Sequence, residues 1–145
     1  MNNKKLPSYE EVCMRASNKG KRIYISGPMS AATQEEFAKN VHHFHDAAML
    51  LQAQGYRPVN PACAWPCRFG WLYRAMELLL GKELAYRTVL CYDLWLLARC
   101  HCICLIDGWR DSRGARIEEH FAFRMGIVKT REYHPDGKIF STIKP

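Results

Sequence analysis

"HCICLIDGWRDSRGARIEEHFAFRMGIVK" (101–129) decides the fold class of this 145-residue chain. It begins with an apolar run over 101–107, which is typical of a buried strand. After a loop, residues 114–125 carry apolar side chains at helical spacing, and Gly126 marks the end of the helix. The short apolar segment 127–129 is typical of another strand. A strand, a helix and a second strand in succession predict a βαβ unit, in which the two strands are parallel.

The same alternation of strands and helices continues along the rest of the chain. A long amphipathic helix is expected from Thr33 to Gly55, with Glu36 completing a capping box at its start. Further strands are expected over 21–27, 56–62 and near 139–140, and further helices over 8–18 and 71–99, with a break near Gly81. We therefore predict an α/β fold with a mostly parallel sheet, in one domain over 21–145 that follows a basic arm or short helix over 1–20.

The composition indicates a globular domain with a sizeable core. The chain is 48% hydrophobic and 24% charged, and its length suits a single domain. Its net charge of +7 is compatible with nucleic acid or an anionic small molecule as a partner. However, part of the excess lies before the first strong strand, which favours a solvated basic arm. No element interleaves basic and aromatic residues, so a nucleic-acid partner is not expected.

The distribution of apolar residues also bears on location. No stretch approaches the roughly 18 to 20 apolar residues that a membrane span needs. Residues 1–20 lack the apolar centre of a signal peptide. We therefore expect no membrane partner and a cytoplasmic location, where cysteine thiols stay reduced.

The seven cysteines are interpreted as reduced residues, several of them in the core. Cys100, Cys102 and Cys104 alternate along an expected strand, so we predict that they share one of its faces. Their spacing does not match the paired C-x2-C ligands of a structural zinc site. We therefore expect neither a metal nor a bound cofactor.

A glutamate in the helix over 114–125 is predicted to point inward. At about 100° per residue, Glu118 falls near the middle of the apolar side of this helix, while Glu119 falls at its edge. The apolar side is formed by Ile117, Phe121, Ala122 and Met125. Burying a carboxylate is costly unless it is hydrogen-bonded or partly protonated, so Glu118 is a candidate for chemistry. Two alternatives remain open: a first-turn glutamate that favours the helix dipole, or an error in the helical phase.

Asp93 is a second carboxylate on an apolar stripe. Its neighbours at helical spacing are Val89, Leu90, Leu96 and Leu97. A structural aspartate that caps a loop or pairs with an arginine is the alternative interpretation. Two inward carboxylates at one cleft suit a reaction in which one attacks or stabilises a positive carbon and the other moves a proton.

Three loops are expected to meet at the carboxyl ends of the parallel strands. They cover residues 27–30, 60–62 and 107–113, and ligands of open α/β sheets bind at this edge. The phosphate-binding motifs GxxxxGK[ST] and GxGxxG are absent, as is the GxSxG motif of serine hydrolases. These absences argue against a P-loop enzyme, a dinucleotide-binding domain and a serine nucleophile.

Four segments of the chain together resemble a known superfamily. They are "RIYISGPM" (22–29), "GYRPVNPA" (55–62), "YDLWLLARCHCICLIDGW" (92–109) and "DSRGARIEEHFAFRMG" (111–126). In this order they resemble the nucleoside 2-deoxyribosyltransferase superfamily over about residues 21–129. The likeness is greatest to a small phage and bacterial branch of unassigned function, and the deoxynucleoside 5′-monophosphate N-glycosidases are more distant. The resemblance implies a flavodoxin-like fold, with a parallel sheet between helices, and a homo-oligomer.

The resemblance also implies roles for individual residues. Glu118 stands four residues after Gly114, which is the spacing of the nucleophile in this superfamily. Asp93 precedes a Leu-x-Trp-Leu run, as the superfamily aspartate does, and Tyr24 on the first strand would orient the glutamate. Residues that would bind the substrate are Gly27, Pro28, Met29, Asn60, Trp109, Ser112 and Gly114. For Trp109, stacking on a base and a place in the core or an interface are both open.

The implied reaction breaks an N-glycosidic bond in a nucleoside or nucleotide. Glu118 would attack the anomeric carbon, and the covalent glycosyl-enzyme would pass its sugar to water or to a second base. Asp93 would donate a proton to the departing base or hold the substrate in place. The base, the sugar and the acceptor stay open, and NAD is also a possible substrate. The non-enzymatic alternative is a binding protein of the same fold that holds a nucleotide-like ligand without turning it over.

One loop departs from the pattern of the monophosphate hydrolases. Their first loop contains an arginine and further glycines that grip phosphate, whereas residues 28–32 here are Pro-Met-Ser-Ala-Ala. The loop therefore gives no support to a 5′-phosphate on the substrate. An anion site at the start of the helix is the alternative, formed by Ser112 and the amides near Gly114. The nearby arginines are Arg110, Arg113 and Arg116.

Overall fold

Five strands form one sheet in the computed structural model, which describes residues 8–64, 70–133 and 139–140. The strands are β1 (Arg22–Ser26), β2 (Arg57–Val59), β3 (Cys102–Ile106), β4 (Val128–Tyr133) and β5 (Ile139–Phe140). Their order is β2-β1-β3-β4-β5; the first four are parallel and β5 runs antiparallel to β4. The β2-β1-β3-β4 order is that of a flavodoxin-like fold, as the sequence predicted.

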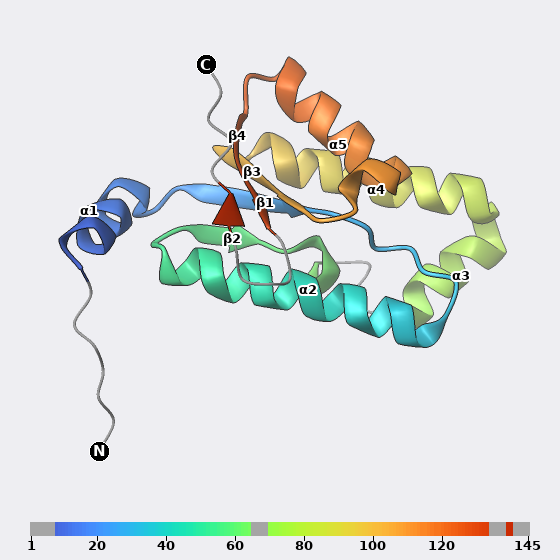
Figure 1. Cartoon of the computed structure of the whole chain (residues 1–145). Helices are drawn as coiled ribbons and strands as arrows, with labels where there is room; N and C mark the ends of the chain where they lie inside the picture. The colour runs from blue at the N-terminus through green and yellow to red at the C-terminus, as the bar shows by residue number, and fades with distance from the viewer. Residues whose placement is uncertain (1–7, 65–69, 134–138, 141–145) are drawn as a thin grey trace.

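Helices cover both faces of the sheet (Figure 1). They are α1 (Tyr9–Asn18), α2 (Gln34–Ala53), α3 (Gly70–Leu80), α4 (Lys82–Ala98) and α5 (Arg113–Arg124), and single 3-10 turns span Pro61–Cys63 and Trp109–Asp111. The helix α2 lies on one face, while α4 and α5 lie on the other. The predicted elements are present, including the break at Gly81, but the strand predicted over 56–62 is shorter: β2 ends at Val59, and Pro61–Cys63 form a 3-10 turn. The strand β4 extends to Tyr133, beyond the predicted 127–129, because it pairs with β3 along its length. The sequence also predicts a loop over 65–70; residues 65–69 lie outside the described residues, and Gly70 begins α3.

The start of α2 shows how the sequence sets a helix boundary. The hydroxyl of Thr33 accepts a hydrogen bond from the backbone N–H of Glu36 over 3.2 Å, as the capping-box pattern predicts. The carboxylate of Glu36 reaches back to the N–H of Ala32 over 3.1 Å, one residue before the cap. At the other end, Gly55 adopts a φ of +94°, which favours glycine. The boundaries of α2 therefore follow from local side-chain chemistry.

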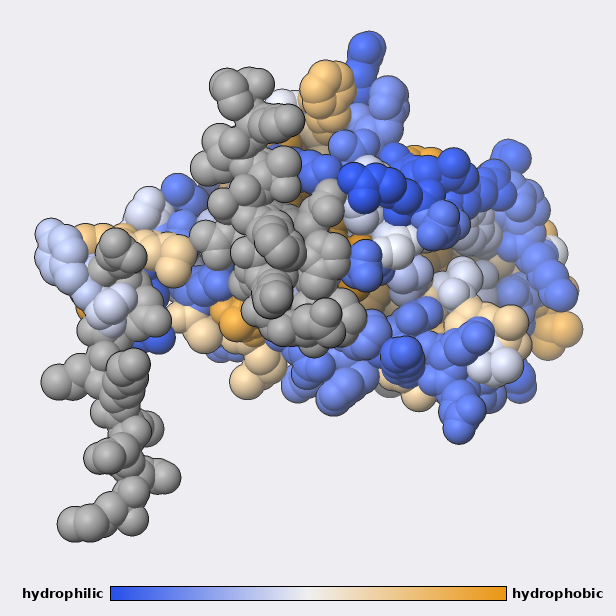
Figure 2. All heavy atoms as spheres, viewed as in Figure 1, coloured by the Kyte–Doolittle hydropathy of each residue, from blue (hydrophilic) through white to orange (hydrophobic). Residues whose placement is uncertain are grey.

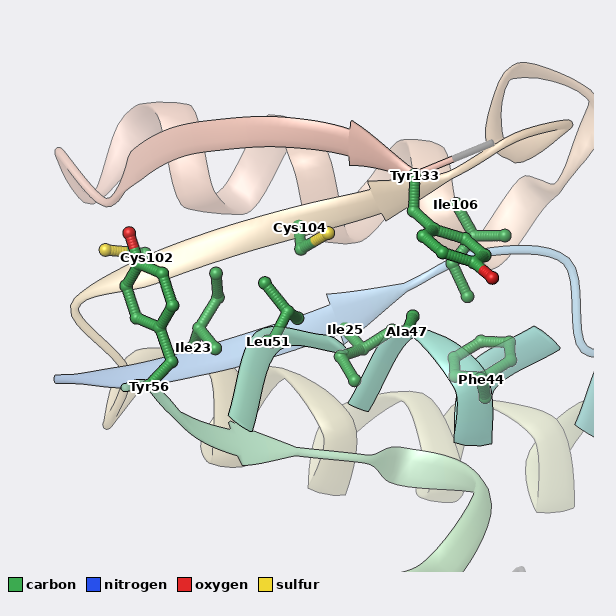
Figure 3. Close-up of a cluster of buried hydrophobic side chains, with 10 residues drawn as sticks. All are labelled: Ile23, Ile25, Phe44, Ala47, Leu51, Tyr56, Cys102, Cys104, Ile106 and Tyr133. Atoms are coloured by element: carbon green, nitrogen blue, oxygen red, sulfur yellow. The ribbon is translucent and has the colours of Figure 1, made fainter. Parts of the chain in front are cut away.

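Two hydrophobic clusters, one on each face of the sheet, form the core. The first lies between the sheet and α2, where Ile23 and Ile25 of β1 pack with Phe44 and Leu51 (Figure 3). The second packs α4 and α5 against the other face and includes Tyr24. Because side chains alternate along a strand, Tyr24 and Ser26 share the face covered by α4 and α5. This alternation places two hydroxyl groups beneath α5.

The cysteines confirm one prediction and correct another. Cys100, Cys102 and Cys104 are all buried, as expected for core residues. They do not share one face, because Cys102 and Cys104 pack with α2 whereas Cys100 belongs to the cluster on the opposite face. Cys100 precedes β3, and its thiol donates a hydrogen bond to the carbonyl of Leu96 in the last turn of α4, over 3.3 Å. The position of the Cys100 side chain is therefore set by the end of α4 and not by the alternation along β3.

Met125 also departs from its predicted position. It was expected on the apolar side of its helix, but it is the C-cap residue of α5 and its side chain is 57% exposed. In the part of the chain that the structure describes, no group of three or more histidine, cysteine or acidic side chains is placed to hold a metal ion. None of the described helices is both long and apolar enough to cross a membrane.

Candidate active site

The carboxylate of Glu118 lies between two hydroxyl groups of β1. The side chain is only 6% exposed, although it is ionisable. Tyr24 donates a hydrogen bond from Oη to Oε1 over 2.8 Å, and Ser26 donates one from Oγ to Oε2 over 2.5 Å. The predicted inward position of Glu118 is confirmed, and Glu119 beside it is only partly buried. The two donors fix the orientation of the carboxylate, since each oxygen has its own partner.

Burial and hydrogen bonding act in opposite directions on the pKa of Glu118. Burial raises this pKa to about 7, and the hydrogen bonds from Ser26 and Tyr24 limit the rise. Burial, with the nearby Glu118 charge, raises the pKa of Tyr24 well above its ordinary value, so its phenol stays a donor. Both the ionised and the protonated forms of Glu118 are therefore populated near neutral pH.

Asp93 is the second carboxylate of the site. It lies on the face of α4 that lines the cleft, together with Tyr86, Val89 and Leu90. Its pKa is raised to about 8, first by burial and then by the negative charge of Glu118 nearby. At neutral pH Asp93 is therefore mostly protonated and able to donate a proton, while Glu118 is the stronger acid of the pair.

The two carboxylates lie in a large cleft, with a volume of about 990 Å³, at the carboxyl edge of the sheet. The three loops that were predicted to meet there do so, since the lining includes residues 27–31, 61–62 and 111–113. Side chains of α2, α3 and α4 complete the walls. On the face shown in Figure 2, hydrophilic residues cover much of α2 and α5, and a band of less polar residues lies between them.

Glycine is needed at one position of the cleft and leaves space at another. A Cβ on Gly27 would lie 2.8 Å from the Cβ of Ile106, closer than such atoms approach in proteins. A Cβ on Gly114 would lie 3.4 Å from Oη of Tyr86, at ordinary contact distance. The close packing of Gly27 therefore brings the first loop against β3.

A family model describes the greater part of this fold. It is described as a domain of unknown function, DUF4406, and it matches residues 21–130. The chain belongs to this family. No curated protein matches the chain. The matched region begins just before β1 and ends within β4, so the DUF4406 domain contains Tyr24, Asp93, Glu118 and all three loops of the cleft.

Most of the predicted binding residues of this DUF4406 domain line its cleft. They are Gly27, Pro28, Met29, Ser112 and Gly114. The hydroxyl of Ser112 caps α5, because it accepts a hydrogen bond from the N–H of Ala115 over 3.3 Å. Asn60 is not among the residues that line the cleft. Its side-chain oxygen accepts a hydrogen bond from the N–H of Ala62 over 2.9 Å, so Asn60 caps the 3-10 turn of the second loop.

Trp109 lies in the core of the DUF4406 domain and not on the wall of the cleft. Its side chain is 9% exposed and packs in the cluster beneath α4 and α5. Two cations lie over its ring, with the guanidinium of Arg110 at 4.7 Å and the ammonium of Lys129 at 4.9 Å from the centroid. Of the two interpretations that the sequence left open, the structure places the side chain in the core.

The arginines near the start of α5 differ in position. Arg113 lines the cleft, whereas Arg110 and Arg116 do not. The guanidinium of Arg113 donates a hydrogen bond to Oε1 of Glu83 over 3.3 Å. Arg74 and Lys82 also line the cleft, on α3 and α4. Cations are therefore present in the cleft, but Arg74 and Lys82 lie outside the segment at the start of α5 where the sequence predicted an anion site.

Sequence reasoning also missed Ser26 and Tyr86 in this site. Ser26 donates to Glu118, and its position two residues after Tyr24 on a strand was the available signal, since such residues share a face. Tyr86 lines the cleft seven residues before Asp93, and this spacing on a helix places both on one face. Both residues are therefore related to Tyr24 or Asp93 by a spacing that the sequence shows.

Proposed function

We propose that the chain breaks, or transfers, the N-glycosidic bond of a nucleoside or nucleotide. The observation that carries this proposal is a pair of carboxylates at one cleft: buried Glu118, which is oriented by two hydroxyl donors, and half-buried Asp93, which is mostly protonated beside it. The resemblance of four sequence segments to the nucleoside 2-deoxyribosyltransferase superfamily supports the same reaction.

In the proposed first step, ionised Glu118 attacks the anomeric carbon of the sugar. The bond from this carbon to the base nitrogen breaks as the bond to a glutamate oxygen forms, and Asp93 gives its proton to the departing base. The products are a covalent glycosyl-enzyme and the free base. The hydrogen bonds from Tyr24 and Ser26 hold the carboxylate in one orientation, so little rearrangement is needed before the attack.

In the second step, water or another base takes the sugar from Glu118. Asp93, now ionised, accepts the proton of the attacking water, and the bond between the sugar and Glu118 breaks. This step restores ionised Glu118 and protonated Asp93. The net reaction with water converts one nucleoside into a free sugar and a free base.

The size and lining of the cleft suit this class of substrate. Its volume of about 990 Å³ lies at the upper end of the roughly 300 to 1,000 Å³ that is typical of small-molecule sites. Apolar lining residues such as Met29, Phe37 and Val41 offer contacts to a planar base. Arg74 and Lys82 allow for a substrate that carries negative charge.

We also propose that the chain forms a homo-oligomer, as the resemblance implies. Large apolar side chains on α3 stand in solvent, with Leu78 88% exposed and Leu79 83% exposed. Exposed apolar residues that lie side by side are typical of interaction surfaces. Light scattering coupled to size-exclusion chromatography measures the state directly, and a monomer at high protein concentration would contradict this part of the proposal.

The test of the proposed reaction is an assay of free-base release. The protein is incubated with ribo- and deoxyribonucleosides, their 5′-monophosphates and NAD, and the products are separated by chromatography. Glu118→Gln is expected to abolish release, while Glu119→Gln, one residue further on the same helix, is the matched control and is expected to retain it. If the folded wild type retains a ligand but releases no free base from any substrate, the result would contradict the enzymatic proposal and favour a binding protein.

A further inference from the structure

The outward face of α4 carries a stripe of apolar and small side chains that are open to solvent. They recur at intervals of four, three and four residues, which is the spacing of a coiled-coil seam: Leu84, Thr88, Cys91 and Trp95. All four are exposed, with Leu84 at 51% and Trp95 at 52%. The hydroxyl of Thr88 donates a hydrogen bond to the carbonyl of Leu84 over 2.8 Å. Another helix can therefore cover the stripe without leaving this hydroxyl unpaired.

A shallow hollow lies at the amino end of the stripe. It has a volume of about 380 Å³ and is lined by Leu80, Gly81, Lys82, Glu83, Leu84 and Arg87. Gly81 leaves room in it, since a Cβ at this position would meet nothing within 4 Å. The leucines offer apolar contacts, and the guanidinium of Arg87 can lie over an aromatic ring. The hollow is therefore suited to a large aromatic side chain.

Trp95 supplies such a side chain at the other end of the same stripe. It stands eleven residues after Leu84, which is about 16 Å along the helix axis and close to three full turns. Its ring stacks with that of Tyr92 at a centroid distance of 5.7 Å, and the guanidinium of Arg99 lies 4.8 Å from its centroid. These contacts hold the half-exposed indole in place, so little freedom is lost when a partner covers it. Tryptophan, tyrosine and arginine are also the residues that most often anchor interfaces.

The stripe is self-complementary about its middle. Two antiparallel copies of α4 can be related by a two-fold axis that passes between residues 89 and 90. Trp95 of each copy then stands level with Leu84 of the other and faces its hollow, while Thr88 stands level with Cys91. The small side chains at the centre allow the helices to approach closely, and the large ones meet the hollows at the two ends.

The apolar surface that continues from the stripe suits a dimer in size. Leu78, Leu79 and Leu80 directly precede the hollow and are 88%, 83% and 46% exposed. Together with the stripe, they offer on the order of the 800 Å² per partner that a stable interface buries. A second copy is the occupant that fits, because the aromatic side chain and the hollow lie on one helix at positions that a two-fold axis exchanges.

We propose that two copies of this chain form a dimer through antiparallel α4 helices, with Trp95 of each copy seated in the hollow at Leu84 of the other. The inference rests on the homo-oligomer of the proposed function and assigns its contact surface. A two-fold contact of this kind uses both hollows and both tryptophans, so the assembly closes at two copies.

Trp95→Ala tests the anchor of this interface. We expect the dissociation constant of the dimer, measured by sedimentation velocity over a range of protein concentrations, to rise at least about 30-fold. Leu84→Glu places a charge in the hollow and should weaken the dimer in the same way. Phe123→Ala is the matched control, because Phe123 is an aromatic residue that is 75% exposed on α5, away from the stripe, and it should leave the dimer unchanged. Melting temperatures show that each variant is folded.

Disulfide cross-linking tests the antiparallel register. Thr88→Cys introduces a thiol that should stand level with Cys91 of the other copy, so mild oxidation should give a covalent dimer on a non-reducing gel. The same variant with Cys91→Ser is the control and should lose this dimer. A covalent dimer that persists without Cys91 would contradict the proposed register.

The measurements separate this inference from the proposed function. If the wild type is an oligomer whose dissociation constant is unchanged by both Trp95→Ala and Leu84→Glu, only the assigned surface is wrong. If the wild type is a monomer at high concentration, the surface and the proposed homo-oligomer both fail. The proposed reaction is tested independently by base release from the wild type.

Discussion

Tyr24 donates a hydrogen bond to Glu118 over 2.8 Å and so joins β1 to α5 across 94 residues of sequence. Neither position is unusual alone, since one is an aromatic residue on a strand and the other a glutamate on a helix. Together with the hydrogen bond from Ser26, this contact offsets part of the cost of burying the carboxylate and fixes its orientation.

Tyr24→Phe is expected to raise the pKa of Glu118 further. The hydrogen bond from Tyr24 favours the ionised carboxylate, so its removal favours the protonated form. In a profile of kcat/KM against pH, the acid limb should move to higher pH, and activity at neutral pH should fall about tenfold. Ser26→Ala should act in the same direction. An acid limb that stays in place in both variants would show that it does not report Glu118.

The activity of the wild type is expected to depend on pH in a bell shape. The active form has Glu118 ionised and Asp93 protonated, and their pKa values are raised to about 7 and about 8. Activity should therefore rise as pH passes 7 and fall as it passes 8, with a narrow maximum between. Initial rates of base release from pH 5 to 10 test this. A broad plateau down to pH 5 would contradict the raised pKa of Glu118.

Asp93→Asn separates proton donation from sugar transfer. The amide cannot protonate a departing base, so release from an ordinary nucleoside should fall by at least about 100-fold. In a single turnover, a nucleoside whose base is already cationic, such as one methylated at N7 of a purine, needs no proton on departure, so release of its base should be much less affected. An equal loss of single-turnover release on both substrates would assign Asp93 to positioning.

Gly27→Ala is expected to destabilise the fold. The new Cβ would lie 2.8 Å from the Cβ of Ile106, so the first loop or β3 must shift. We expect a loss of about 1 to 3 kcal/mol in the free energy of unfolding, measured by chemical denaturation. Gly70→Ala is the control, since nothing lies within 4 Å of its added Cβ, and it should be neutral or slightly stabilising. Equal effects of the two substitutions would contradict the close packing of Gly27.

Much of the fold could be predicted because its signals are local. The helix boundary at Thr33 and the break at Gly81 depend on a few neighbouring residues. The inward position of Glu118 followed from the apolar residues of its own helix, which define the side that packs on the sheet. These predictions needed no knowledge of which elements meet.

The parts that could not be predicted depend on contacts between distant segments. Cys100 appeared to continue the pattern of β3, but the end of α4 sets its environment. Trp109 follows a strand as a ligand-binding residue would, yet the packing of α4 and α5 buries it. The unpartnered hydroxyl of Tyr86 is defined by the absence of a neighbour among the described residues, which a sequence pattern cannot show.

The raised pKa of Asp93 also predicts how stability depends on pH. Its pKa is about 8 in the folded protein, against 3.8 for an unperturbed aspartate. Between these values the unfolded chain gains stability by releasing a proton that the folded protein keeps. The resulting loss of folding stability is absent below about pH 4, grows as pH rises and reaches its full size above about pH 8.

Asp93→Asn removes this pH-dependent loss of folding stability and should therefore stabilise the protein most at high pH. We expect the melting temperature of the variant to exceed that of the wild type by roughly 5 °C at pH 9, and by far less at pH 4.5. Differential scanning calorimetry of both proteins at the two pH values measures the difference. A constant difference across pH would mean that Asp93 ionises normally in the folded protein, and a variant less stable at pH 9 would mean that the carboxylate has a stabilising partner. Because the same substitution is expected to reduce base release, a gain in stability together with a loss of activity would show that Asp93 is retained for chemistry at the expense of stability.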